Sequence, residues 1–347
     1  MIIYIKNLIK SKIKEIGFSK KTLIKIHPRF DLINRNSKNV IAKYSFGSKN
    51  PNKKFYVIKR TPGGGFFSNL LYVILNLKIA NKKKYIPVVD MCNFPTNYNQ
   101  KKNIYNKKNI WDLFFDPVSK YDLDEVYKSQ NVYFSPTNLK FRLEKYKKPE
   151  LKKIFDRYIK VNKKVLNTVK LFEKKNFKNK KVLGIHFRGT DQKIAPNHAH
   201  PPTIFEIESL IQKKIVNGNF EKFFLLTEDL SYYKYLKKKY KNFICSYDYF
   251  RAKKIKEFST SSRNNHRNTL GFENLIEAIT LSKCDEIVFC ESNIPLFAIF
   301  YSNFKITINH IDNGEKSSNI LIARFSWYLS VYFPQLIKHY LSIPSKL

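Results

Sequence analysis

Residues 181–193 read Lys-Val-Leu-Gly-Ile-His-Phe-Arg-Gly-Thr-Asp-Gln-Lys, and this stretch indicates the fold most directly. An apolar run that ends in turn residues is typical of a buried strand, and Gly189 supplies the turn. In an open α/β sheet, ligands bind just beyond the carboxyl ends of such strands. Arg188 is therefore predicted to emerge at the rim of a sheet, as a bidentate partner for a phosphate or carboxylate. A structural ion pair at the strand end is the alternative role for this arginine.

The second half of the chain alternates between strand and helix patterns, which favours a parallel, doubly wound sheet. The expected strands are 181–187, 222–227, 242–245, 285–290 and 305–308. The expected helices are 203–217, 231–240, 271–283 and 294–302. A long Lys-rich helix over 149–176 is expected to lead into this half.

Polar residues that packing does not require follow three of the expected strands. They are Arg188 after the first strand, Thr227, Glu228 and Asp229 after the second, and Glu291, Ser292 and Asn293 after the strand at 285–290. Ser292 or Asn293 would cap the helix that begins near Pro295. Free N–H groups at such a helix start bind phosphate oxygens. The sequence therefore predicts a nucleotide-shaped ligand at this rim.

The first half of the chain carries a second α/β pattern. Its expected strands are 54–59, 85–90 and 132–134, and its expected helices are 66–82 and 111–115. The glycine run from Gly63 to Gly65 lies between the first strand and the first helix. A tight turn explains this run, and so does a close approach of the backbone to a ligand.

Three segments, in order along the chain, resemble one family of enzymes. His186-Phe-Arg-Gly-Thr-Asp191 resembles the His-x-Arg-Arg-Thr-Asp core of the superfamily of α1,6-fucosyltransferases, Nod-factor fucosyltransferases and protein O-fucosyltransferases, and His200-Pro201 fits the loop after that core. Gly65-Phe-Phe-Ser-Asn69 resembles the family's N-terminal Gly-x-Phe-x-Asn loop. Residues 277–285, followed by Cys290-Glu-Ser-Asn293, resemble its C-terminal block.

The resemblance implies a glycosyltransferase of the GT-B type, with two Rossmann-like α/β domains and a cleft between them. A chain of 347 residues is long enough for two such domains. The expected division is an acceptor-side domain over 1–150, a nucleotide-sugar-binding domain over 151–315 and a helical tail over 316–347. The implied reaction is the transfer of fucose from GDP-fucose to a glycan acceptor, with inversion, without a metal and without a cofactor. The same fold with another nucleotide sugar is the first alternative.

The resemblance also implies roles for individual residues. Arg188 and the helix terminus at Ser292 and Asn293 would neutralise the diphosphate. His186 and Glu277 would face the guanine or the ribose, with Glu277 in place of the family's Asp. The remaining expected substrate contacts are Gly64, Gly65, Asn69, Thr227 and Asp229. Residues 91–110 and 247–268 are expected to be loops that face the acceptor.

The catalytic base has no direct counterpart, because Pro196 stands where α1,6-fucosyltransferases have a Glu. Asp191 and His198 are the two candidates, and a His base works well near neutral pH. No Asp-x-Asp follows an expected strand; Asp122-Leu-Asp124 has that spacing but is expected in a Lys- and Tyr-rich loop of the first half. No metal site is therefore predicted.

The net charge of +38 comes almost entirely from lysine, since only 10 of the 65 basic residues are Arg. Lysine excess of this kind is typical of an AT-rich genome, although it also attracts polyanions and membrane surfaces. A nucleic-acid-binding protein is the second alternative. The dispersed lysines, the few arginines and the lack of a recognisable module argue against specific nucleic-acid binding.

The cysteines and the two termini bear on the compartment. Four cysteines without C-x-x-C spacing favour a reduced, cytoplasmic protein. No run of about 20 uncharged apolar residues is present, which argues against a spanning helix. Residues 2–16 and 320–341 combine apolar and aromatic residues with lysine or arginine at helical spacing. Such helices either lie in a membrane interface, which would make the protein peripheral, or pack against the domains.

Overall fold

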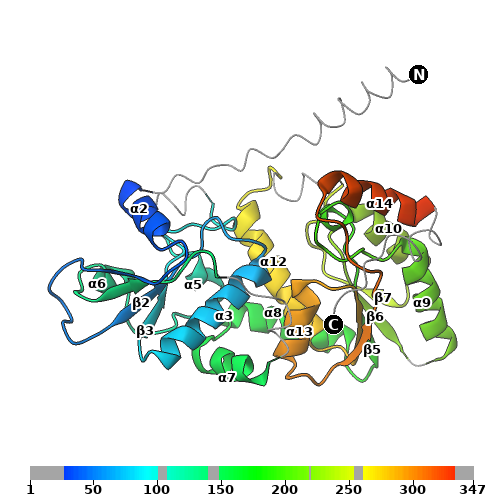
Figure 1. Ribbon diagram of the computed structural model, residues 1–347. Helices are drawn as coiled ribbons and strands as arrows, with labels where there is room; N and C mark the ends of the chain where they lie inside the picture. Colours follow the sequence, from blue (N-terminus) through cyan, green and yellow to red (C-terminus); the bar gives the residue numbers. More distant parts are fainter. Residues whose placement is uncertain (1–26, 101–107, 140–147, 219, 254–260, 333–347) are drawn as a thin grey trace, which may run out of the picture.

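The computed structural model describes residues 27–100, 108–139, 148–218, 220–253 and 261–332 (Figure 1). It is a mixed α/β structure with two sheets, which lie at opposite ends of the view in Figure 1. Helices α3, α7, α8, α12 and α13 lie between the two sheets.

The sheet of the first half has the order β1-β4-β2-β3. Its strands are β1 (Ala42–Tyr44), β2 (Phe55–Ile58), β3 (Ile86–Val89) and β4 (Val132–Phe134). β2 runs parallel to β3 and β4, whereas β1 pairs antiparallel with β4 at the edge. The three expected strands are confirmed. Its helices are α2 (Pro28–Asn36), α3 (Phe66–Lys82), α5 (Trp111–Phe114) and α6 (Leu123–Val126).

The sheet of the second half is parallel throughout, with the order β7-β6-β5-β8-β9. Its strands are β5 (Val182–His186), β6 (Lys222–Leu226), β7 (Ile244–Cys245), β8 (Glu286–Phe289) and β9 (Thr307–His310). Its helices include α9 (Ile204–Val216), α10 (Leu230–Lys239), α12 (His266–Leu281) and α13 (Asn293–Tyr301). The parallel, doubly wound sheet is confirmed. The strand order reverses between β5 and β8, and this is the point at which open α/β sheets bind ligands.

The expected long helix over 149–176 is wrong, because the structure contains two helices there. α7 spans Pro149–Tyr158 and α8 spans Lys163–Asn176. Between them the backbone pairs with the end of α5, since Asp116 N–H donates to Lys160 O at 2.9 Å. The Asn162 side chain then accepts from Lys164 N–H and caps α8. A cap and an extended pairing therefore interrupt a segment whose lysines and leucines fit a continuous helix.

Smaller differences concern the element boundaries. α12 begins at His266, five residues before its expected start, and β9 lies two residues later than expected. Asp122 does not stand in a loop but caps α6, where its Oδ1 accepts from Glu125 N–H at 2.7 Å.

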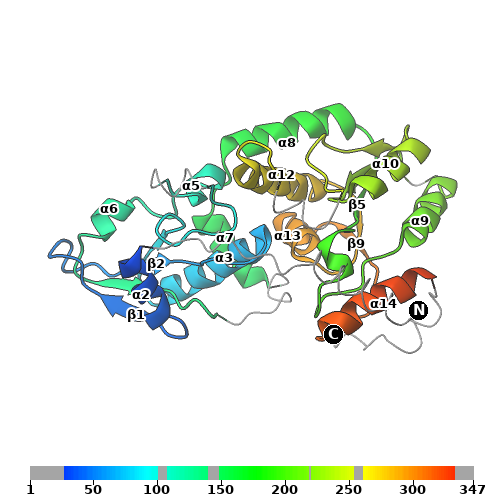
Figure 2. The same cartoon turned by 90° about the horizontal axis from the view of Figure 1, so that it is seen from above.

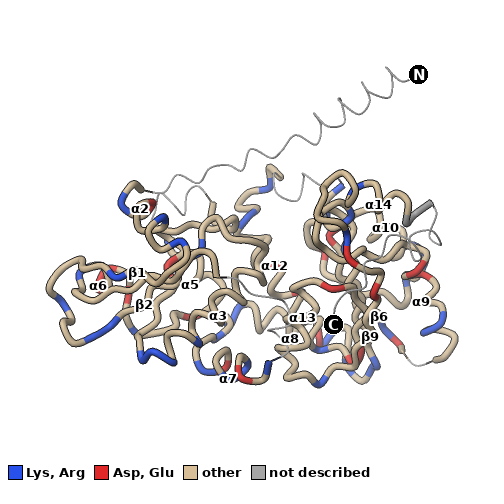
Figure 3. The backbone as a smooth tube through the Cα atoms, in the orientation of Figure 1, with Lys and Arg blue, Asp and Glu red and all other residues tan. Residues whose placement is uncertain are grey.

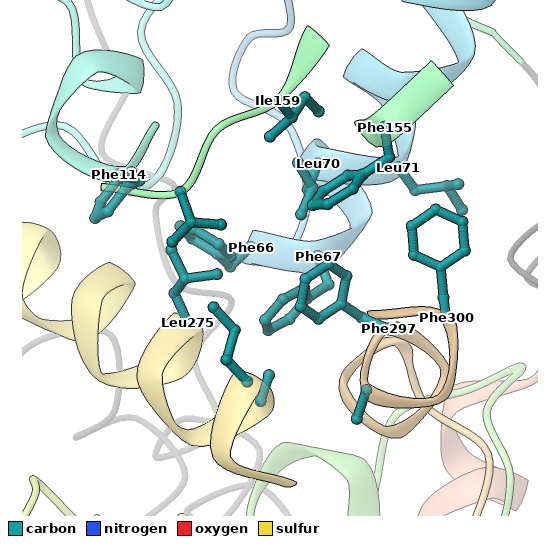
Figure 4. Close-up of a cluster of buried hydrophobic side chains, with 14 of the residues drawn as sticks. Phe66, Phe67, Leu70, Leu71, Phe114, Phe155, Ile159, Leu275, Phe297 and Phe300 are labelled. Carbon is teal, nitrogen blue, oxygen red and sulfur yellow. The ribbon is translucent and has the colours of Figure 1, made fainter. Parts of the chain in front are cut away.

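The helices between the sheets share one hydrophobic core (Figure 4). Most of α3 is buried, because its own sheet covers one side and α7 and α13 cover others. The Phe67 ring lies 4.6 Å from the Phe297 ring of α13, between centroids. Phe155 of α7 packs against Phe297 and Phe300, at 6.1 and 5.5 Å. Contacts of this density join the two halves through their helices.

The last described helix is α14 (Ile320–Tyr332), which covers part of the segment expected to be an aromatic terminal helix. The expected helix over 2–16 and the end of the chain beyond Tyr332 lie outside the described residues. Within the described residues, no helix has the length and apolar character that crossing a bilayer requires.

Candidate functional site

The sequence-predicted residues of the second half meet at the carboxyl ends of β5, β6 and β8. Arg188 stands two residues after β5, and the chain then turns into a short 3-10 helix, η2 (Asp191–Lys193). Gln192 of η2 lies against the end of β8, with its Nε2 3.4 Å from Glu291 O. The loop after β5 therefore crosses the switch point towards the start of α13.

Glu228, which follows β6, anchors this loop. Its Oε1 accepts from Arg188 Nε at 3.3 Å and from the N–H groups of Gly189 and Thr190 at 3.2 and 3.3 Å. The Thr190 hydroxyl donates to the same oxygen at 2.9 Å. The structural ion pair considered for Arg188 is therefore present. The Arg188 side chain is still 24% exposed, so it can also reach a ligand at the rim.

Asp229 and Thr227 support the loop from the end of β6. Asp229 caps α10, where its Oδ1 accepts from the N–H groups of Ser231 and Tyr232, and its Oδ2 pairs with Lys193 at 3.0 Å. Burial raises the pKa of Asp229, but the bonds from Ser231 and Lys193 outweigh it and leave the pKa below its usual value. Thr227 Oγ1 accepts from Asp229 N–H at 3.2 Å. Both predicted residues are thus joined in one network.

Gly189 is the residue that lets the loop approach α10. A Cβ added there would lie 2.6 Å from the Tyr232 ring and 2.7 Å from Asp229 Oδ2. Any larger side chain would displace the loop that carries Arg188, so the glycine is required by close packing.

Several buried polar atoms at the switch point have no hydrogen-bond partner among the described residues. They are both ring nitrogens of His186 and of His200, Gln192 Oε1, Ser292 Oγ and Asn293 Oδ1. Unsatisfied buried polar groups cost about 1–3 kcal/mol each, so native structures contain few of them. These atoms gather around one rim of the sheet, which makes this rim the candidate site.

The two histidines are uncharged in this environment. Burial, together with the nearby positive charge of Arg188, lowers the pKa of His186 to about 3. Burial also lowers the pKa of His200 to about 4, with a contribution from Lys316. A neutral imidazole offers one donor and one acceptor, which suits recognition of a ribose or a base better than neutralisation of a phosphate.

Ser292 is the N-cap of α13 by position, but its side chain makes no capping bond. The predicted helix start is therefore confirmed, and its N–H groups are not capped by Ser292. Partial positive charge at such a terminus favours phosphate oxygens.

Glu277 is buried on α12, 3.9 Å from Arg251. The pKa of Glu277 is raised to about 8. Burial is the largest cause; the Arg251 charge opposes it, and the carboxylates of Glu273 and Glu228 add to it. Glu273 itself forms a bidentate pair with Arg263, at 2.7 and 2.9 Å. Glu277 is therefore a buried residue and not part of the solvated surface of α12.

Arg251, Arg263 and Glu273 also belong to this region, and none of these three was identified individually from the sequence. The rarity of arginine in the sequence is a signal that could have located the two arginines of this group. Only ten arginines occur in a chain with 65 basic residues. A chain that otherwise uses lysine retains arginine where a planar, bidentate cation is needed.

The backbone of the glycine loop in the first half is hydrogen-bonded by the side chain of Asn69, which follows the loop in α3. Asn69 is buried, its Oδ1 accepts from Gly64 N–H at 2.8 Å, and its Nδ2 donates to Gly64 O at 3.3 Å. Gly63 adopts φ +73°, so the tight-turn explanation holds there. A Cβ at Gly65 would meet nothing within 4 Å, which leaves space beside the backbone at that position.

The two candidate bases lie in different settings. Asp191 is the first residue of η2. His198 is exposed, and its Nδ1 lies 2.8 Å from Pro196 O.

A pocket in the first half is formed partly by the loop that was expected to face the acceptor. Half of the residues that line it are aromatic. Its lining includes Met91, Thr96 and Tyr98 from that loop, together with Trp111 and Phe114 of α5.

Comparison with known proteins supports the fold. No protein-family model and no curated protein sequence matches the chain. Among solved structures, the chain is similar to the NodZ alpha-1,6-fucosyltransferase co-crystallized with GDP, with a TM-score of 0.53 and 14% identity over 76% of this chain and 96% of that chain. The selenomethionine form of fucosyltransferase NodZ from Bradyrhizobium gives a TM-score of 0.50 and 14% identity over 75% and 96%.

The chain has a fucosyltransferase-like fold. The expected resemblance is thereby confirmed at the level of architecture. Within the described residues of this fold, no group of three or more His, Cys, Asp or Glu side chains is arranged to hold a metal ion.

Proposed function

We propose that the protein is an inverting, metal-independent glycosyltransferase that transfers fucose from GDP-fucose to a glycan acceptor. The observation that carries this proposal is the set of unpartnered buried polar atoms at the rim between β5 and β8, from His186, Ser292 and Asn293. The fucosyltransferase-like fold supports it, since one solved structure of that fold was co-crystallized with GDP.

We assign the donor to the second sheet and the acceptor to the first. Residues 151–315 would form the nucleotide-sugar-binding domain, 1–150 the acceptor-side domain and 316–347 a helical tail, with a GT-B cleft between the domains. In this arrangement His186 and Glu277 contact the guanosine, and Arg188 and the start of α13 contact the diphosphate. Thr227 and Asp229 stabilise the loop that carries Arg188 and do not contact the donor directly, because their side chains bond within the protein.

The chemistry requires neutralisation of a leaving group. An acceptor hydroxyl attacks the anomeric carbon, the bond from that carbon to the phosphate oxygen breaks, and its electron pair leaves with GDP. Negative charge then develops on the diphosphate, where fixed cations and N–H donors stabilise it. Arg188 and the N–H groups of α13 supply these donors, so a metal ion is not needed for this step.

The acceptor proton goes to a base, for which Asp191 and His198 both stand as candidates. We also propose that Gly64 and Gly65 contact substrate through their backbone. Asn69 then acts by holding the loop, since both ends of its amide bind Gly64.

A donor panel tests the proposed function. The protein is incubated with GDP-fucose, GDP-mannose, UDP-glucose and ADP-glucose, and release of the nucleoside diphosphate is measured. Turnover of GDP-fucose above the other donors supports the proposal. Preference for GDP-mannose would retain the site but change the sugar, and turnover of UDP- or ADP-sugars alone would overturn the donor assignment.

A further inference from the structure

Arg251 is a buried arginine on the segment that follows β7, and only 2% of its side chain is exposed. Its Nη1 donates to Tyr249 O at 2.9 Å, and its Nη2 donates to Tyr247 O at 3.0 Å. The guanidinium carbon lies 3.9 Å from the centre of the Tyr233 ring of α10. Two carbonyl groups and one aromatic ring therefore fix the position of this cation.

The backbone beside Arg251 is joined to the rim of the second sheet. The Ala252 N–H donates to Glu228 O at 2.8 Å, and the Leu230 N–H donates to Ala252 O at 3.1 Å. On its other side, Arg251 approaches Glu277 of α12. Arg251 therefore lies between the end of β6, where Glu228 anchors the loop after β5, and the residue that we assign to the guanine.

Arg251 acts on Glu277 through its charge and not through a hydrogen bond. Arg251 Nη2 lies 3.9 Å from Glu277 Oε1, which is beyond the range of a hydrogen bond. A positive charge at such a distance favours the ionised form of a carboxyl group. Because Arg251 does not bond the carboxylate, the Glu277 oxygens are left to the N–H donors of a ligand, and 12% of this side chain is exposed.

The other titratable groups that face this part of α12 come from four segments of the chain. They are Glu273 on α12 itself, Glu228 after β6, Tyr247 and Tyr249 after β7, and, beside Tyr247, Glu173 of α8, which lies along α12 (Figure 2). Glu273 and Glu228 add to the effect of burial, which raises the pKa of Glu277. Burial also raises the pKa of both tyrosines, so these phenols are uncharged. In the part of the chain that the structure describes, Arg251 is the charge that opposes these effects on Glu277.

The many lysines of the chain do not take the place of Arg251. Lys and Arg are spread along the whole described chain (Figure 3). Salt screens exposed charges that are more than about 10 Å apart, whereas it screens a buried pair much less. The short distance and the burial of Arg251 therefore make its effect on Glu277 specific.

We propose that Arg251 is the positioning residue that makes Glu277 available to guanine as a carboxylate, through its charge and without bonding it. The proposal rests on the proposed function, because it requires Glu277 to contact the base of the donor. Without Arg251, the burial of Glu277 and the two neighbouring carboxylates are unopposed, so Glu277 ionises only at a higher pH. The contribution of Arg251 to nucleotide binding then depends on pH, which a purely structural role would not produce.

Two titrations of the full chain test the proposal. In the free protein, labelled with ¹³C at the glutamate carboxyl groups, NMR follows the resonance that Glu277→Gln removes and gives the pH at which Glu277 is half ionised. Calorimetry gives the GDP affinity between about pH 6 and pH 10. Both are measured for the wild type, Arg251→Gln, Arg251→Lys and the control Arg267→Gln. Arg267 also lies on α12, where its Nη1 donates to Asn97 O at 2.7 Å.

We expect Arg251→Gln to raise the pH of half-ionisation of Glu277 by about one to three pH units. At neutral pH the GDP affinity should fall by roughly tenfold for each unit, and this loss should shrink above about pH 8, where the variant also begins to ionise. Arg251→Lys keeps the charge and should restore most of the affinity, and the control should stay within about twofold of the wild type. If the melting temperature shows that Arg251→Gln is not folded, Arg251→Met, which keeps an apolar stem, takes its place.

Two results would overturn the proposal. The first is an unchanged pH of half-ionisation of Glu277 in the folded variant that lacks the charge. The second is a loss of GDP affinity that has the same size at every pH, because Arg251 would then act only through its packing and its bonds to the two carbonyls. A wild type that binds GDP no better than UDP would overturn the proposed function and the guanine contact with it. The titration of the free protein distinguishes that case, since it measures the effect of Arg251 on Glu277 without a nucleotide.

Discussion

The loops after β2 and after β5 have similar positions, since each follows a parallel strand and crosses the edge of its sheet, but their polar groups are satisfied differently. After β2, the Asn69 amide binds the backbone of Gly64 in both directions. After β5, the backbone is held by Glu228, which follows the neighbouring strand β6, and buried polar atoms of His186, Ser292 and Asn293 find no partner in the part of the chain that the structure describes. The Asn69 amide satisfies the backbone of the first loop, whereas the second loop lies beside polar atoms that we propose a ligand would satisfy. This difference is the reason to place the donor nucleotide at the second sheet.

Replacing Arg188 is expected to have the largest effect. Arg188→Ala should lower the transfer rate by roughly 100- to 1000-fold, because one charge-assisted contact to the leaving group is lost. Arg188→Lys should be nearly as poor, since the planar fork is lost. Arg60→Ala, beside the glycine loop, is the matched control and should leave GDP affinity within about twofold of the wild type. Near-full activity of Arg188→Ala would show that Arg188 has only a structural role, in its ion pair with Glu228.

Glu277→Gln should have the next largest effect, and only on guanine nucleotides. At pH 9 the Glu277 carboxylate would accept from the N1 and N2 groups of guanine. Loss of a hydrogen bond to a charged group costs about 1.5–3 kcal/mol, so GDP should bind roughly 10- to 150-fold more weakly. UDP binding, measured by the same calorimetric titration, should not change. Equal affinity of the wild type for GDP and UDP would remove the proposed role of Glu277.

The raised pKa of Glu277 makes GDP binding depend on pH. With a pKa of about 8, the free protein holds a proton on Glu277 at neutral pH, and binding to the ionised form must release it. GDP affinity should therefore increase with pH up to about 8, by as much as roughly tenfold per pH unit below that value. Titrations in two buffers with different ionisation enthalpies measure the proton released. The same pH slope in Glu277→Gln would assign the proton to another group.

Asn69→Ala should affect stability more than donor binding. It leaves the Gly64 N–H and C=O without their partner, at a cost of about 1–3 kcal/mol, and should lower the melting temperature by roughly 3–10 °C. GDP affinity should stay within about twofold of the wild type, because the first loop does not hold the nucleotide. A large loss of GDP affinity in a folded Asn69→Ala protein would contradict the difference between the two loops.

EDTA should have the smallest effect, with no loss of transfer activity. Arg188 and the start of α13 supply the positive charge that a metal ion would otherwise bring to the diphosphate. Activity is measured before and after chelation, and again with added Mn²⁺. Loss on chelation with recovery in Mn²⁺ would show that these donors do not suffice.

The sequence predicted the parallel sheet well because its signal is local. Each of β5, β6 and β8 is a short apolar run between polar or turn residues, and each is buried on both faces. Strand β1 was missed because a three-residue edge strand, Ala42–Tyr44, carries no such run. The break after Tyr158 was missed because it depends on pairing with the distant end of α5.

The site was predicted in part for the same reason. Residues at strand ends, such as Arg188 and Asp229, can be located from the pattern. The pairing of Glu228 with a backbone segment some 40 residues earlier cannot, because it depends on the neighbouring positions of β5 and β6. The raised pKa of Glu277 likewise depends on burial by the fold and on its neighbours Glu228 and Glu273.

A crystal structure of the protein soaked with GDP tests the central claim most directly. We predict that the diphosphate lies between the Arg188 guanidinium and the first turn of α13, with the guanine towards Glu277. His186, Ser292 or Asn293 should gain hydrogen-bond partners from the nucleotide in that structure. GDP bound at the Gly63–Gly65 loop instead, or a switch point that stays empty at saturating GDP, would contradict the account.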